Sequence, residues 1–182
     1  MILPMYILGQ SVLRSKSNDI DMDYPNLQEL IKDMYETMQK ADGVGLAGPQ
    51  VGLPINMFVI DLDVLSEDYP EYKGFLHAFI NPKILESSEE TESIEEGCLS
   101  LPGIHENVRR PTQVHVTYLD ENGTAHDEWL NGFLARVFQH EYDHLEGKLF
   151  VDRLSTLRKQ MIRKKLIAMT KGKYECSYKV KK

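Results

Sequence analysis

The sequence lacks any apolar run of about 18 residues, the length that a transmembrane helix needs. Its first residues, Met1 to Met5, lack the basic stretch and the small-residue cleavage site of a secretory signal. Only two cysteines are present, Cys98 and Cys176. We therefore expect a cytoplasmic protein with no membrane segment, in which both thiols are free rather than paired.

Internal repeats, low-complexity segments and domain linkers are absent as well. The chain has 182 residues, of which 42% are apolar and 27% are charged, as in an ordinary globular protein. We expect residues 1–182 to form a single domain. The alternation of short strand patterns with a few helical ones predicts an α+β fold, with antiparallel sheets around one central helix.

Hydrophobic periodicity predicts three helices. The first runs from about Pro25 to Lys40, the second precedes Gly147, and the third runs from about Ser155 to Thr170. Residues 1–24 read as irregular and residues 61–74 as a solvated acidic loop. Strands are expected within the following ranges: 55–60, 76–80, 83–85, 86–96, 113–119, 124–130 and, as a last edge strand, 174–180.

Residues 42–52 contain four glycines and a proline, which predicts an ordered loop whose backbone bends sharply or approaches another group closely. It is not a phosphate-binding loop, because no Lys-Ser/Thr pair follows and a helix rather than a strand precedes it. Either a simple structural turn or a loop that offers backbone N–H groups and the Gln50 amide to a carbonyl group fits this pattern.

The most informative motif is His140-Glu141-Tyr142-Asp143-His144. Histidines four residues apart lie on one face of a helix, so both imidazoles can bind one metal ion, and the glutamate beside the first can take a proton from bound water. Phe133 and Val137 fall on the same helical face. The alternative is a surface helix with two solvated histidines, since the motif also arises by chance.

A catalytic site of this type needs a third protein ligand. The extended HExxHxxGxxH pattern fails, because Phe150 occupies the position of its last histidine. In thermolysin-like proteases the third ligand is a downstream glutamate. Beyond Glu146 the only such residue here is Glu175, and its place in the short basic tail makes it a weak candidate. Cys98 lies upstream among charged and small residues, and a thiolate with two imidazoles suits a divalent transition metal. A buried cysteine is more often inert packing, so both interpretations of Cys98 remain open on this ground alone.

Three segments together resemble the peptide deformylase family: GVGLAGPQ at 43–50, EGCLS at 96–100 and QHEYDHLEG at 139–147. The family signatures GxGLAAxQ, EGCLS and HExDHLxG occur in this order, and the resemblance extends from Ile2 to the last helix. One departure is Gly48, where the family usually has alanine. The resemblance implies a metal-dependent hydrolase of protein biosynthesis that removes the N-formyl group from the N-terminal methionine of nascent peptides and releases formate.

The resemblance also implies roles for individual residues. Cys98, His140 and His144 would hold one divalent metal, with Fe2+ expected and Zn2+, Ni2+ or Co2+ able to substitute. Glu141 would be the general base and later the acid. The remaining expected positions are as follows: Gln50 and the Leu99 N–H on the formyl oxygen; Val44, Ile94, Phe133 and Val137 around the methionine side chain; Gly45 and Gly97 on the substrate backbone; and Glu96 paired with Arg110.

Two other functions remain to be weighed. A metallopeptidase would share the HExxH residues but would not need the Cys98 thiolate. A non-catalytic ribosome-binding module would use the basic C-terminal region. Residues 153–182 carry eleven Lys/Arg and one acid, Glu175, which gives a net charge of +10. Because the whole chain has a net charge of −7, residues 1–152 carry −17. Such a basic end suggests RNA, and hence the ribosome, as a partner, although a solvated helix explains it equally well. We expect binding neither to DNA nor to a membrane.

Overall fold

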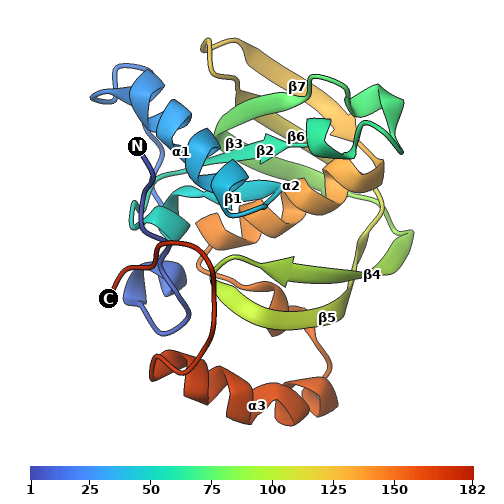
Figure 1. Cartoon of the computed structure of the whole chain (residues 1–182). Helices are drawn as coiled ribbons and strands as arrows, with labels where there is room; N and C mark the ends of the chain where they lie inside the picture. Colours follow the sequence, from blue (N-terminus) through green and yellow to red (C-terminus); the bar gives the residue numbers. More distant parts are fainter.

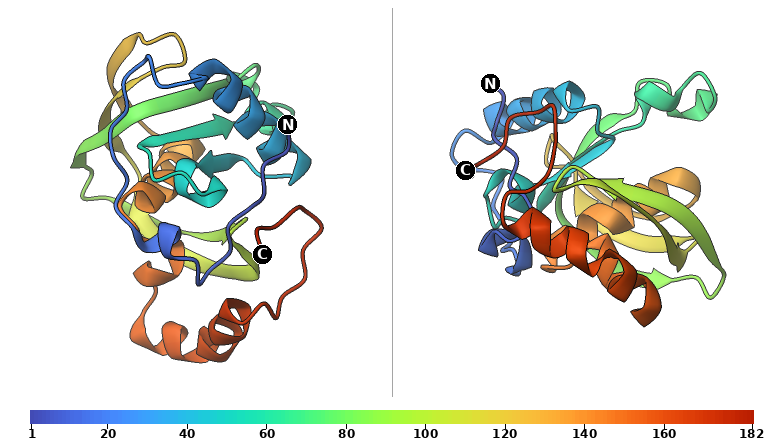
Figure 2. Two further views of the ribbon diagram at one scale, coloured as in Figure 1. Left: turned by 90° about the vertical axis from the view of Figure 1, so that its left-hand side faces the viewer. Right: turned by 60° about the horizontal axis from the view of Figure 1, so that its bottom comes forward.

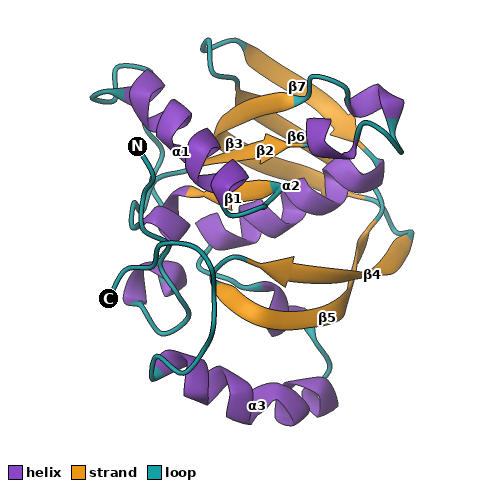
Figure 3. Cartoon of the chain, viewed as in Figure 1, coloured by secondary structure: helices purple, strands orange, loops and turns teal.

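Strand β2 (Met57–Asp61), whose five residues are all buried, lies in the sheet that supports the rest of the molecule. The computed structural model describes residues 1–182 and places β2 in a five-stranded sheet of order β1-β2-β3-β6-β7, in which every pairing is antiparallel. Figure 3 shows this sheet together with a separate hairpin, β4–β5. The other strands are β1 (Gly45–Ala47), β3 (Leu76–Ser87), β4 (Thr91–Cys98), β5 (Leu101–Pro111), β6 (Val114–Leu119) and β7 (Ala125–Leu130).

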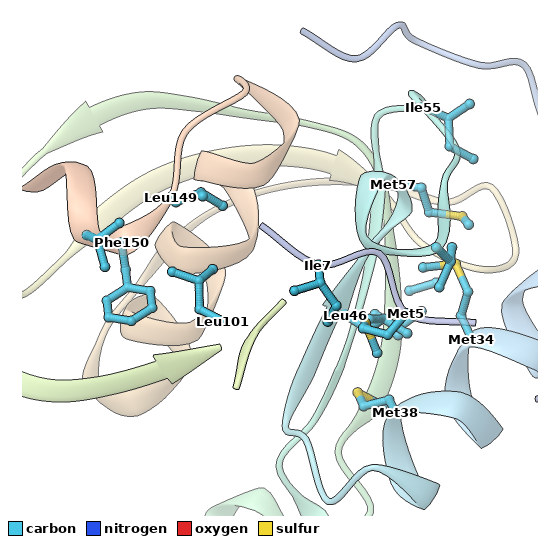
Figure 4. Packing of buried hydrophobic residues seen from close by; sticks show 14 of the residues in the cluster. Met5, Ile7, Met34, Met38, Leu46, Ile55, Met57, Leu101, Leu149 and Phe150 are labelled. Atoms are coloured by element: carbon cyan, nitrogen blue, oxygen red, sulfur yellow. The ribbon is translucent and has the colours of Figure 1, made fainter. Parts of the chain in front are cut away.

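The alternation of side chains along β2 places a different helix on each face of the sheet. Phe58 and Ile60 pack in the hydrophobic cluster that contains the apolar face of α2 (Gly132–Leu145). Met57 belongs to a second cluster, with α1 (Leu27–Lys40). Figure 4 shows Met34 and Met38 pointing from α1 toward the sheet. The methionines of the first helix therefore fill the core.

Helix α2 lies between the five-stranded sheet and the β4–β5 hairpin (Figure 1). Helix α3 (Thr156–Thr170) lies on the far side of the hairpin, and the chain after it returns to the N-terminal segment, so that both termini lie on one side of the molecule (Figure 2). None of the helices is long and apolar enough to cross a membrane. The α+β fold and the central position of the HExxH helix are confirmed.

The three predicted helices are present, and their ends show ordinary signals. The Ser155 hydroxyl accepts a hydrogen bond from the Arg158 N–H and caps α3. Gly147 and Gly172 follow α2 and α3 with φ of +75° and +79°, a conformation that glycine adopts without steric cost. The hairpin predicted around Asn122-Gly123 is also confirmed, as β6 and β7.

Several strand predictions were wrong. Asn81-Pro82 does not divide two strands, because β3 continues through it with a shift of register, and Asn81 takes up the irregularity with φ of +51°. Strand β5 was not predicted. The loop at 42–52 contains the short strand β1 and a 3-10 helix, Gly48–Val51. The expected edge strand at 174–180 is only a single bridge between Met5 and Val180.

Candidate metal centre and cleft

The thiol of Cys98 and the imidazoles of His140 and His144 meet where the end of β4 faces α2. One ligand atom from each of the three residues lies within 4.8 Å of the other two. The Cys98 Sγ lies 3.3 Å from the His144 Nε2. The ring of Phe150, the residue that excluded the extended HExxHxxGxxH pattern, stacks on the ring of His140 at 5.7 Å between centroids.

Glu141 lies beside this cluster with only 3% of its surface exposed. Burial raises the pKa of its carboxyl to about 7, which suits a group that accepts a proton and later returns it near neutral pH. Its Oε1 atom has no hydrogen-bond partner in the protein. A Cβ at Gly45 would lie 2.6 Å from the Glu141 Oε2, so the glycine at this position makes room for the carboxylate.

The Gln50 amide is held in one orientation. Its Oε1 accepts a hydrogen bond from the Ala47 N–H at 2.9 Å, so its Nε2 faces the Cys98 Sγ at 3.5 Å and the Ser100 Oγ at 3.2 Å. Leu99 lies between these two residues, and its N–H makes no hydrogen bond within the protein. Two N–H donors, one from Gln50 and one from Leu99, therefore lie next to the thiol.

A buried carboxylate, Glu96, joins the β4–β5 hairpin to helix α2. It accepts hydrogen bonds from Arg110 at 2.6 and 2.9 Å, from Arg136 at 2.7 Å and from the His140 Nδ1 at 2.8 Å. Burial alone would raise the pKa of Glu96, but the hydrogen bonds from His140 and Arg110 outweigh it and hold this pKa well below its usual range. Because an ionised carboxylate only accepts, a proton of His140 lies on Nδ1, and Nε2 is the ring atom available to a metal. Burial alone would lower the pKa of His140, but hydrogen bonds with Cys98 and Glu96 hold this pKa above its ordinary value, so a metal would displace a proton from Nε2.

Asp143, inside the HExxH motif, extends this charge network. It accepts hydrogen bonds from Arg110 at 2.9 Å and from Arg153 at 2.7 Å through each of its oxygens. Arg110 is fully buried, and its guanidinium binds two carboxylates from different elements. The central helix is thus fixed by buried ion pairs at both ends of the motif.

The three residues fit a divalent transition metal. Burial lowers the pKa of His144 to about 3, so its imidazole is neutral and can donate a lone pair. One thiol and two imidazoles form a suitable donor set, and they leave a coordination position for water, as a catalytic site requires. The orphaned Glu141 Oε1 beside them is consistent with a water molecule at that position.

The cluster opens into a cleft of about 440 Å³. All the site residues predicted from the sequence line this cleft except three: Arg110 and His144 are buried, and Ile94 lies half-buried on β4. The cleft residues among them are Val44, Gly45, Gln50, Glu96, Gly97, Cys98, Leu99, Phe133, Val137, His140 and Glu141. The proximity of Cys98, His140 and His144 agrees with the predicted ligand set.

Other residues of the site were not predicted. Arg136 lies one helical turn before His140, a position that gives no indication of its partner Glu96. His105 faces Gly97 across the hairpin, where a Cβ would meet its ring at 2.8 Å. The C-terminal residues 175–178 also line the cleft, although no sequence signal connects them to it.

Comparison with known proteins agrees with the fold and the site. The family model described as polypeptide deformylase matches residues 2–160. The peptide deformylases of Flavobacterium johnsoniae and Christiangramia forsetii are 49% and 47% identical over all of this chain and 96% of their own length. The crystal structure of the Thermus thermophilus enzyme has a TM-score of 0.83 with 38% identity, covering 94% of this chain and 99% of that one. The crystal structure of the peptide deformylase from Synechococcus elongatus, in complex with actinonin, has a TM-score of 0.78 with 41% identity. This match covers 90% of this chain and 85% of that one.

The fold and the Cys-His-His cluster are those of a metal-dependent hydrolase. The family match and the curated relatives then define the reaction. The chain belongs to the polypeptide deformylase family, a family of metal-dependent enzymes that remove the N-formyl group from newly synthesised peptides.

The buried ion pairs predict a large effect of one arginine. Replacing Arg110 by alanine leaves Glu96 and Asp143 short of a buried partner and should lower the free energy of unfolding by about 3–5 kcal/mol. The neighbouring Arg109 is exposed and donates only to the Thr91 hydroxyl, so Arg109→Ala should cost less than about 0.5 kcal/mol. Urea unfolding of both variants measures the difference, and equal losses would contradict the role of the network.

Proposed function

We propose that Cys98, His140 and His144 bind the catalytic metal and that Glu141 is the general base and then the general acid. The metal would supply a Lewis acid that makes water nucleophilic near neutral pH and polarises the formyl carbonyl group. The Glu141 Oε1, which has no partner in the protein, would take the proton of the attacking water. The same carboxyl, with a pKa of about 7, would then protonate the leaving amine.

The Gln50 Nε2 and the Leu99 N–H would stabilise the negative charge that develops on the formyl oxygen. The orientation of the Gln50 amide by the Ala47 N–H and the free N–H of Leu99 support this role. Donors that are already in place when charge develops stabilise a transition state without reorganisation. Each is expected to contribute about 3 kcal/mol, by comparison with other oxyanion sites.

The substrate would lie between two strand edges. Val44, Phe133 and Val137 line the cleft and would contact the methionine side chain, and Ile94 would contribute from β4. Gly45 is on β1, the edge strand of the large sheet, and Gly97 is on β4 of the hairpin. Both glycines would exchange backbone hydrogen bonds with the peptide, as when a strand is added to a sheet.

The metal would be Fe2+, with Zn2+, Ni2+ or Co2+ able to replace it. Thiolate and imidazole ligands accept all of these ions, so the donor set supports the proposal without selecting among them. With Fe2+ bound to the thiolate, the site should also be sensitive to oxygen, because oxygen can oxidise ferrous iron, whereas Zn2+ has no redox chemistry.

The basic region from about residue 153 would dock the enzyme, as one catalytic domain of residues 1–182, on the ribosome in the cytoplasm. Four cations of α3, namely Lys159, Arg163, Lys164 and Lys165, are exposed, and none of them forms an ion pair. Figure 1 shows this helix on the outside of the molecule, below the hairpin. Unpaired positive charge on an outer helix is suited to the phosphates of RNA.

Glu141→Gln should retain the metal and lower the rate of formate release from a formyl-methionyl peptide by about 10²- to 10⁴-fold, because the proton acceptor is lost. Glu146→Gln, at the end of the same helix, is the matched control and should keep the wild-type rate. An unformylated peptide tests the peptidase alternative, since its cleavage would favour that reaction. Near-normal formate release by Glu141→Gln would rule out the proposed base.

Protein prepared without oxygen should contain about one iron per chain, because one cluster of three ligands is present. Its rate of formate release should fall on exposure to air, whereas protein reloaded with nickel or zinc should not lose activity. Elemental analysis in parallel with the activity assay provides the measurement. Zinc as the sole metal, with full activity in air, would contradict the assignment of iron.

The double variant Lys164→Glu/Lys165→Glu should bind ribosomes more weakly. The slope of the logarithm of its binding constant against the logarithm of the salt concentration should be smaller by about one for each lost phosphate contact. Lys32→Glu/Lys40→Glu on α1 makes the same change of charge on another exposed surface and is the control. Sedimentation with ribosomes at several salt concentrations measures both. Unchanged binding of the α3 variant would contradict docking through this helix.

A further inference from the structure

The C-terminal tail, residues 173–182, forms part of the wall of the active-site cleft. After Gly172 it leaves α3 and crosses to the side where the N-terminal segment lies (Figure 2). Four consecutive residues, Glu175 to Tyr178, line the cleft next to Leu99 and Cys98. None of the proposed chemical steps uses these four residues.

Backbone hydrogen bonds fasten the tail to Met5. The Met5 N–H donates to the Lys179 carbonyl oxygen at 2.9 Å, and the Lys181 N–H donates to the Met5 carbonyl oxygen at 2.8 Å. The Gln10 Nε2 donates to the Lys181 carbonyl oxygen at 3.3 Å. The end of the tail is therefore held in place by the N-terminal segment.

The same N-terminal segment also holds the backbone of the two oxyanion loops. The Tyr6 N–H donates to the Gln50 carbonyl oxygen at 2.8 Å, and the Leu8 N–H donates to the Ser100 carbonyl oxygen at 2.9 Å. Residues 5–8 thus connect the tail to the loop that carries Gln50 and to the turn that carries Leu99. The position of the tail is defined relative to both proposed donors.

Tyr178 makes a direct contact with that turn. Its half-buried hydroxyl donates a hydrogen bond to the Leu99 carbonyl oxygen at 2.5 Å. On the opposite side, the Leu99 side chain packs against Gly43, where a Cβ would lie 2.7 Å from the Leu99 Cδ1. Leu99 is held by its carbonyl group and by its side chain, while its N–H remains free.

We propose that Tyr178 is a positioning residue for deformylation, which acts by fixing the Leu99 backbone so that its N–H faces the formyl oxygen. The proposal rests on the role proposed for the Leu99 N–H. A donor contributes to catalysis in proportion to how well its direction is set before charge develops. Residue 99 lies in the turn between Cys98 and Leu101, the last pair of β4 and β5, which restrains the peptide group that carries the Leu99 N–H. The Tyr178 hydroxyl adds a restraint on the next peptide group, so the backbone is held on both sides of Leu99.

Tyr178→Phe removes the hydroxyl and keeps the ring. It should lower kcat for a formyl-methionyl peptide by about fivefold, the effect of one hydrogen bond, and leave KM within about twofold of the wild type. The restraint acts on the transition state, whereas a general loosening of the cleft would raise KM. Tyr178→Leu, which also lacks the hydroxyl, should reduce kcat at least as much.

Tyr174→Phe is the matched control, because Tyr174 lies in the same tail, packs against the core and does not line the cleft. Its kcat and KM should equal those of the wild type. A kcat of Tyr178→Phe equal to that of Tyr174→Phe would overturn the proposal. A loss of kcat that follows a loss of bound metal would also overturn it, because Tyr178 would then act on Cys98.

Glu141→Gln, measured in the same series, separates this inference from the proposed mechanism. If Glu141→Gln is inactive and Tyr178→Phe is fully active, only the role of Tyr178 fails. If Glu141→Gln is active, the proposed mechanism fails, whatever the effect of Tyr178→Phe.

Discussion

The Glu96 carboxylate imposes the strictest constraint in the structure. An ionised carboxylate removed from water is tolerated only when donors surround it, and the loss of one partner is costly. The donors come from two elements, since Arg110 lies on β5 while Arg136 and His140 lie on α2. The hairpin and the central helix can therefore pack in only one relative position, and Asp143 reinforces it by binding the same Arg110.

This constraint places the three proposed metal ligands. Cys98 follows Glu96 by two residues on β4, so fixing Glu96 against His140 also brings the thiol to the imidazoles. The opposite wall of the cleft belongs to the large sheet, where β1 approaches α2 so closely that a Cβ at position 45 would meet the Glu141 side chain. Glu141, the proposed general base, is thus enclosed between two sheets that share one helix. Its exclusion from water raises its pKa into the range that proton transfer requires.

Local patterns were sufficient for the helices and for most of the large sheet, because periodicity and turn residues act over a few positions. The continuation of β3 through Asn81 was missed because a bulge depends on the partner strand rather than on the residue that bends. Strand β5 was missed since residues 101–111, with two adjacent arginines, do not alternate. The Glu96–Arg110 pair followed from the family resemblance. The pairing of Arg136 with Glu96 was missed, because nothing in the sequence around Arg136 indicates a partner 40 residues away.

The tail shows why a strand pattern is not yet a strand. From residue 173 to 181 exposed and half-buried positions alternate, as they do along an edge strand. That alternation shows only that one side of the tail is buried. A β-strand also needs hydrogen bonds to a neighbouring extended segment, and Met5 provides such a neighbour only at Val180. The half-buried side chains of the tail therefore pack against a surface other than a neighbouring strand, and the Tyr178 hydroxyl donates a hydrogen bond to the Leu99 carbonyl oxygen. The N-terminal segment and the tail meet beside the cleft, where hydrogen bonds join them to the backbone of Gln50, Leu99 and Ser100.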